Sequence, residues 1–153
     1  MNIRSVATIF LLAFLLGVIG CGSGEEGSEI GVVGTWNGLC EEKEGGQSSK
    51  SQLIFTEEEF SVSFLKYSVS SCSGIYQIDL EKAGTYQIGN EFVSADGVMA
   101  LEFNAIEDSI YFYDLILIEN DKLYTGLVDD ENDGSTPEKR PKNVNFLKYW
   151  TRE

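Results

Sequence analysis

From Val32 onward, the chain contains short runs in which apolar and polar residues alternate. In one such run Tyr76, Ile78 and Leu80 point to one face and the residues between them to the other. A period of two is typical of a strand that buries one face. Turn residues recur at intervals of about 8–12 residues, as in all-β sandwiches and barrels. No window sustains a helical stripe, so the pattern predicts an all-β domain.

The pattern places strands in nine segments separated by turn residues. Short connections between consecutive strands favour antiparallel neighbours. Closing such a meander into a barrel removes the edges that an open sheet would expose. We therefore expect an antiparallel meander of about 8–9 strands closed into a barrel. The predicted strands are Val33–Glu42, Ser51–Thr56, Phe60–Tyr67, Ile75–Leu80, Gly84–Ile88, Val98–Ile106, Ser109–Glu119, Lys122–Val128 and Asn143–Thr151.

One predicted strand is apolar on both faces, from Ile110 to Ile118, except at Asp114. Such a strand is covered on its outer side or packed by large aromatic residues. Two interpretations of Asp114 remain. It is either a lumenal acid with a raised pKa that holds the polar head of a ligand, or a residue that pairs with an arginine or points outward. We prefer the second interpretation.

The first residues form a secretory leader. Arg4 is its only charged residue, and the apolar core Ile9–Leu16 is too short to span a bilayer. The following Val18-Ile19-Gly20-Cys21 resembles the lipobox of bacterial lipoproteins, in which the cysteine is diacylated and becomes the mature N-terminus. The resemblance implies a signal peptide over 1–20, lipidation at Cys21, a flexible linker over 21–32 and a domain over 33–153. The alternative is an ordinary cleaved signal with an incidental cysteine.

The leader also implies a location. Acyl chains on the cysteine, of the palmitate type, would hold the protein on a membrane of the cell envelope. Gly22 stands where lipoproteins retained in the inner membrane often carry aspartate. We therefore expect the outer membrane, with the domain facing the periplasm or the surface.

Cysteine usage agrees with export. With Cys21 assigned to lipid, Cys40 and Cys72 form an even pair, and we expect a disulfide between them. By the chain-entropy model, this disulfide would stabilise the folded state by about 3.5–4 kcal/mol. Two cysteines in a chain without histidine do not complete a zinc shell, so we expect no metal site.

Composition and net charge exclude several classes of function. The net charge of −14 becomes −15 without Arg4, so nucleic acid would be repelled. The absence of histidine excludes Ser-His-Asp and Cys-His catalysis, and the chain has no Walker or dinucleotide motif. We expect a protein that is not an enzyme and carries no cofactor.

An acidic run, Asp129–Gly134, invites comparison with calcium loops because acidic residues alternate before a glycine. However, Arg140 stands at the twelfth position, where an EF-hand loop needs a bidentate glutamate. The second interpretation is a flexible, solvated crossover limited by Pro137 and Pro141, and we prefer it.

Two short motifs, one at each end of the domain, resemble conserved features of lipocalin-like barrels. Gly34-Thr35-Trp36 looks like their Gly-x-Trp signature, and Arg152 stands where their last strand carries an arginine that packs over that tryptophan. A guanidinium over the indole adds about 0.5–2 kcal/mol. Asn120-Asp121-Lys122 replaces the Thr-Asp-Tyr turn of lipocalins proper, so the resemblance is to the wider lipocalin-like group.

This resemblance implies a barrel that binds or carries a small hydrophobic molecule in the envelope. The alternative is a protein-interaction module of the envelope, with a lumen filled by side chains and an exposed apolar patch for a protein partner. Strand parity gives the candidate pocket residues: Phe64, Tyr76, Ile78, Met99, Leu101, Phe103, Phe112 and Asp114.

Overall fold

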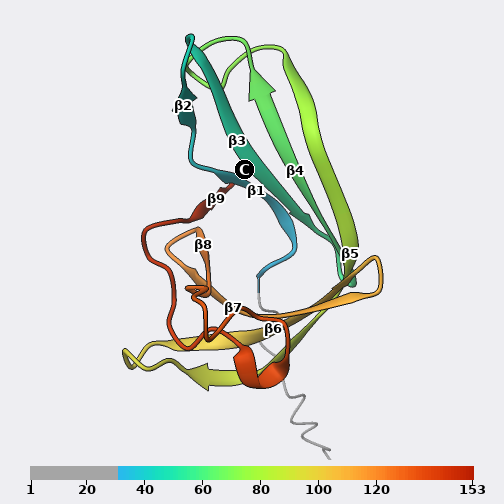
Figure 1. The fold of residues 1–153 in the computed structure, drawn as a ribbon, viewed down its shortest axis with the longest axis vertical. Coiled ribbons are helices and arrows are strands. Elements are labelled where there is room, and N and C mark those ends of the chain that lie inside the picture. The colour runs from blue at the N-terminus through green and yellow to red at the C-terminus, as the bar shows by residue number, and fades with distance from the viewer. Residues whose placement is uncertain (1–30) are drawn as a thin grey trace, which may run out of the picture.

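The computed structural model describes residues 31–153, so Cys21 and the predicted leader lie outside the described residues. The described chain forms nine strands and one short 3-10 helix, η1 (Figure 1). No helix in this part of the chain is long and apolar enough to cross a membrane. The elements are β1 (Gly34–Gly38), β2 (Glu41–Lys43), β3 (Gln47–Phe55), β4 (Glu59–Tyr67), β5 (Tyr76–Val93), β6 (Met99–Glu107), β7 (Ile110–Glu119), β8 (Lys122–Thr125), η1 (Pro137–Lys139) and β9 (Trp150–Arg152).

The strands close into an antiparallel barrel. Each strand from β3 to β9 pairs with the next one along the chain, and β1 pairs with both β9 and β3. Eight strands therefore form the barrel, and β2 extends the sheet beyond β3. The predicted all-β antiparallel meander is confirmed, and its closure is compatible with the lipocalin-like expectation.

Two tight hairpins lie at or within one residue of the predicted breaks between strands. Asp108 and Ser109 connect β6 to β7 with φ values of 48° and 69°, and Asn120 and Asp121 connect β7 to β8 with φ values of 52° and 57°. Two consecutive residues with positive φ match the right-handed twist of the strands on either side. Asp and Asn adopt this conformation more readily than most residues, which explains the sharp reversals.

Several strand limits differ from the predicted ones. The predicted strands 75–80 and 84–88 form one strand, β5, because Gly84 sits in the ladder opposite Phe60 instead of in a turn. A Cβ at Gly84 would collide with the carbonyl of Ile106 and the ring of Phe60. Glycine therefore serves close packing between strands there. The predicted first strand is split into β1 and β2, and only Trp150–Arg152 of the predicted last strand is regular.

Aromatic side chains fill much of the barrel lumen. Phe55, Phe60, Tyr86 and Phe103 contact one another, with ring centroids 5.2–6.4 Å apart. Trp36, fully buried, belongs to the same cluster. Mutual edge-to-face and stacked contacts of this kind stabilise a core beyond its buried area.

A second core lies outside the barrel. Leu115 and Tyr124 point outward from β7 and β8 and are covered by Val144, within the segment 126–149 that we call the strap. This cover explains why β7 is apolar on both faces, as predicted. The acidic residues Asp129, Asp130, Glu131 and Asp133 are exposed on a crossover before the last strand, as the preferred interpretation expected. The crossover is also anchored, because Arg140 and Pro141 are buried against the barrel.

Beyond the barrel, β3, β4 and the first half of β5 continue as an arm, at the top of Figure 1. The loop after β4 folds onto the outer face of this arm. There the Ser48 hydroxyl donates to the carbonyl of Val69 at 2.6 Å and accepts from the amide of Cys72 at 2.9 Å. The predicted disulfide is confirmed, and Cys40–Cys72 ties this loop to the chain between β1 and β2.

Candidate functional site

The lumen face of the sheet continues onto the arm. Along β4, Phe60 and Val62 pack in the lumen cluster, and Phe64 is the next residue on the same face. Phe64 pairs with Ser51 of β3 and Leu80 of β5, so these three residues share that face. Phe64 and Leu80 are 43% and 46% exposed, because none of the strands in residues 31–153 lies opposite the arm.

Two hollows meet at Phe64, and we call them together the mouth site. The larger one measures about 420 Å³ and lies over the arm, and the smaller one measures about 110 Å³ and lies toward β1 and β9. Small-molecule sites typically span about 300–1,000 Å³ and combine an apolar floor with a few polar groups. The apolar floor consists of Leu39, Phe64, Leu80, Tyr149 and Trp150, and the rim carries Lys43, Lys66 and Lys148. Leu65 and Lys50 also border the hollows, but their side chains lie on the opposite face of the arm, with Tyr67.

Trp150 joins the mouth site to the filled lumen. Its ring packs against the lumen cluster, and it also lines the smaller hollow. Its Nε1 donates to the hydroxyl of Ser51 at 2.8 Å. Gly38 leaves the space for this bond, since a Cβ there would lie 3.1 Å from Nε1. Trp150 is therefore fixed in orientation beside the site.

The structure distributes the eight candidate pocket residues over several places. Leu101 and Phe103 pack in the lumen cluster, and Asp114 pairs with Phe103 across the β6–β7 ladder. Phe64 alone reaches the mouth site. The other four are exposed away from it: Tyr76 49%, Ile78 52%, Met99 57% and Phe112 39%.

A bulge explains why strand parity failed on the arm. The β4–β5 register shifts between Phe64 and Leu65, so that Phe64 faces Leu80 while Leu65 faces Ile78. The extra residue, Asp79, turns Ile78 to the opposite face from Leu80. Sequence reasoning therefore missed Leu80. It also missed Leu39, Trp150 and the lysines Lys43, Lys66 and Lys148, because no local pattern brings them together.

Asp114 lies just beyond the last residue pair of the β7–β8 ladder, Ile116 and Thr125. Its Oδ1 accepts from the amides of Leu115 at 2.7 Å and Gly126 at 2.9 Å. Burial raises the pKa of Asp114 to about 6, although these hydrogen bonds and the Arg140 charge act to lower it. Arg140 donates to the carbonyl oxygen of Asp114, not to its carboxylate. The carboxylate thus binds backbone amides and holds the start of the strap.

The raised pKa makes stability depend on pH. Between the unfolded value of 3.8 and about 6, the folded state binds more protons than the unfolded state, so stability falls as pH rises through this window. Asp114→Asn keeps an oxygen acceptor and removes the titration. From pH 4 to pH 7 we expect the wild type to lose about 2 kcal/mol relative to this variant, by urea unfolding. A difference that stays constant over this range would contradict the raised pKa.

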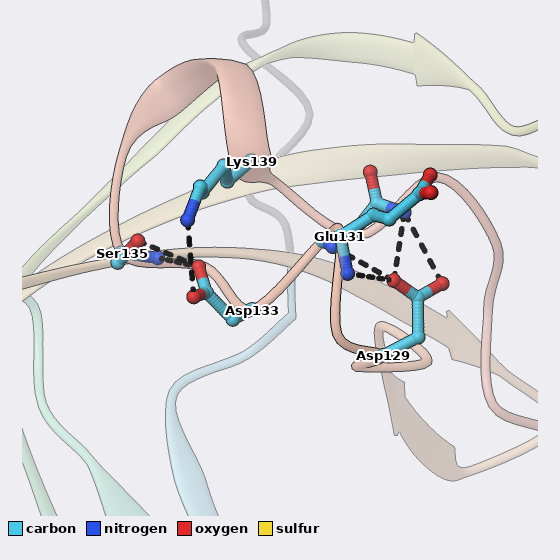
Figure 2. A network of polar contacts seen from close by, with 6 residues as sticks. Asp129, Glu131, Asp133, Ser135 and Lys139 are labelled. Atoms are coloured by element: carbon cyan, nitrogen blue, oxygen red, sulfur yellow. Dashed lines mark hydrogen bonds and ion pairs between the residues drawn. The ribbon is translucent and has the colours of Figure 1, made fainter.

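Two carboxylates of the acidic run Asp129–Gly134 accept hydrogen bonds from nearby residues of the same loop (Figure 2). Asp129 accepts from the amides of Asn132 and Glu131 at 2.7 and 2.9 Å, and Asp133 accepts from the hydroxyl and the amide of Ser135 at 2.6 and 3.0 Å. These bonds hold the pKa of both aspartates below their usual range. Within residues 31–153, no three His, Cys, Asp or Glu side chains converge on a common point. The two carboxylates each cap a separate turn of the strap.

The two ends of the described chain meet at Trp36. Its Nε1 donates to the carbonyl of Val32 at 2.7 Å, and the guanidinium of Arg152 lies 4.3 Å from the ring centroid. Arg152 also donates to the carbonyls of Val33 and Gly31. The predicted closure residues therefore hold the segment that leads into β1 against the last strand.

Comparisons with protein-family models, curated proteins and solved structures gave no significant match to this chain.

Proposed function

We propose that this protein is a non-enzymatic lipoprotein of the bacterial envelope, anchored through acyl chains on Cys21, that binds a small apolar molecule at the mouth site. The lipobox-like leader supports the anchor, and it favours the outer membrane. The described chain begins at Gly31, beside the Gly34 end of β1, whereas the mouth site lies beside the Gly38 end. An anchor that precedes Gly31 would therefore leave the mouth site at the other end of the barrel.

The observation that carries this proposal is the uncovered apolar floor. Aromatic side chains fill the lumen as far as Phe103 and Trp36, yet the same face remains open at Phe64 and Leu80. Single exposed apolar residues are ordinary, but a contiguous apolar floor in a hollow is typical of a binding site. A small ligand that covers Phe64 would complete the lumen core.

A protein-interaction module is the second candidate, and a different observation favours it. The first half of β5, residues 76–84, pairs with β4 but has no strand on its other side among residues 31–153. Exposed edges of this kind accept an added strand from a partner. A filled lumen is also what this function requires.

Fluorescence tests the proposed function, because the chain has two tryptophans and only Trp150 lines a hollow. A long-chain alkane derivative that carries bromine should quench the emission of Trp150 in a saturable manner, since the quencher acts on contact. Phe64→Asp should weaken this binding by about tenfold, which corresponds to about 1.4 kcal/mol of lost apolar contact.

Phe146→Asp provides the matched control. Phe146 is 44% exposed, close to the 43% of Phe64, but it lies on the strap, packs on Tyr124 of β8 and lines neither hollow. We expect its affinity to equal that of the wild type. Equal loss in both variants, or no saturable quenching in the wild type, would refute ligand binding at the mouth site and favour the interaction module.

A further inference from the structure

A third hollow lies at the other end of β1 from the mouth site. It measures about 1310 Å³, and its lining runs from Gly31 and Val33, before β1, across β5, β6 and β7. Six of its lining residues form two rows across these three strands, which we call the outer grid: Gln87, Asn104 and Tyr113 in one row, and Thr85, Ile106 and Tyr111 in the other. The pair between these rows in the β5–β6 ladder, Tyr86 and Ala105, packs in the lumen cluster, so the outer grid faces away from the lumen.

Two tyrosines supply aromatic surface on the outer grid. Tyr111 and Tyr113 lie two residues apart on β7, and their rings are nearly parallel, with 11° between the ring planes and 6.4 Å between the centroids. Tyr111 is 56% exposed, whereas Tyr113 is half-buried. The face of an aromatic ring is apolar and carries partial negative charge, so it attracts C–H groups with partial positive charge. Sugar rings expose such C–H groups on their faces.

The outer grid also offers hydrogen-bonding groups that are held in place. The Oδ1 of Asn104 accepts from Arg140 at 2.8 Å, so the amide nitrogen of Asn104 is left to donate to a ligand. Gly89 keeps this nitrogen uncovered, because a Cβ there would lie 3.4 Å from it. Arg140 is buried and also lies 5.7 Å from the ring centroid of Tyr113, so one ordered group contacts two members of the grid. Groups that are ordered before a ligand arrives lower the entropic cost of binding.

Charge and polarity narrow the class of ligand. Glu57 and Glu58 line the hollow, and no lysine or arginine among the described residues does so. An anion would therefore be repelled, on a chain whose net charge is −14. A purely apolar ligand would leave the exposed amide of Gln87 and the amide nitrogen of Asn104 without partners. A neutral sugar satisfies both conditions, because its hydroxyl groups donate and accept hydrogen bonds.

We propose that the outer grid binds a neutral glycan. The C–H faces of its sugar rings pack on Tyr111 and Tyr113, and its hydroxyl groups exchange hydrogen bonds with Gln87 and Asn104. The hollow is larger than the range of about 300–1,000 Å³ that is usual for small-molecule sites, which favours an oligosaccharide over a single sugar. This site is additional to the mouth site, with which it shares no lining residue.

Calorimetric titration of the full chain tests this inference. The protein is held in micelles of a detergent without a sugar head group, and the probes are cellohexaose, chitohexaose, maltohexaose and the acidic hexamer of galacturonate. At least one of the three neutral hexasaccharides should bind saturably, and about tenfold or more tightly than the galacturonate hexamer. Tyr111→Ala should weaken this binding about tenfold, whereas Tyr111→Phe, which keeps the ring, should bind within about twofold of the wild type.

Tyr76→Ala is the matched control. Tyr76 is 49% exposed, close to the 56% of Tyr111, but it lies at the start of β5 on the arm and lines none of the three hollows. We expect this variant to bind as the wild type does, and Gln87→Ala, a second test within the outer grid, to bind more weakly. No saturable binding by any neutral hexasaccharide, equal binding of the galacturonate hexamer, or equal loss in Tyr76→Ala would overturn the inference. Each of these results would leave the proposed function standing, because the mouth site is separate.

Discussion

Replacing Trp36 by alanine should destabilise the barrel by about 3–5 kcal/mol, because truncating a large buried aromatic residue leaves a cavity that the core does not refill. Trp36 is fully buried in the lumen cluster and is the largest such side chain in the described residues. The substitution also removes the hydrogen bond to Val32 and the ring beneath Arg152. Urea unfolding followed by circular dichroism measures the loss directly.

Two further variants separate the contributions at this position. Trp36→Phe keeps most of the apolar volume and should cost clearly less than Trp36→Ala. Arg152→Met removes the guanidinium and its bonds to Val33 and Gly31 but leaves the buried ring. If Trp36→Ala unfolded at the same urea concentration as the wild type, Trp36 would not be the plug of a packed lumen.

Replacing Arg140 by methionine should release the strap and cost about 3–5 kcal/mol, since it leaves buried acceptors and the charge of Glu102 without their partner. The Arg140 side chain is 8% exposed. It donates to the carbonyls of Phe103 and Asp114 at 3.2 and 2.7 Å and to the side chain of Asn104 at 2.8 Å, and its Nε lies 3.6 Å from Glu102.

Limited proteolysis locates this effect. Cleavage in the acidic run Asp129–Gly134 should become much faster in Arg140→Met, because the strap loses its buried anchor while β1 to β8 keep their ladder. Lys139→Met is the control, because its ion pair with Asp133 is exposed and should leave stability and proteolysis unchanged. Unaltered proteolysis in Arg140→Met would show that the second core, not Arg140, holds the strap.

The sequence was sufficient for the features that depend on local pattern. Alternation along the strands predicted the meander, and the even pair of cysteines predicted the Cys40–Cys72 disulfide. The predicted break at Asn120-Asp121 is a tight hairpin. The apolar outer face of β7 correctly indicated a cover. These features follow from side-chain periodicity and turn chemistry, which act over a few residues.

The rest depends on contacts between distant segments. The bulge at Asp79 reverses the parity of Ile78, and nothing in the local sequence marks it. The strap is polar in composition, so its anchoring by Arg140 to carbonyls of β6 and β7 leaves no signal in a hydrophobic pattern. Phe64 of β4 and Trp150 of β9 are far apart in the sequence, and only the closed barrel brings them together at the mouth site.

Indole resonances test the central claim most directly. The two tryptophans give two indole N–H signals in a ¹⁵N correlation spectrum, one from Trp36, buried in the lumen cluster, and one from Trp150 beside the mouth site. On titration with a long-chain alkane derivative, the signal of Trp150 should shift to saturation while that of Trp36 stays in place. A shift of Trp36 alone, or no shift of either signal, would contradict a binding site at the open end of the barrel.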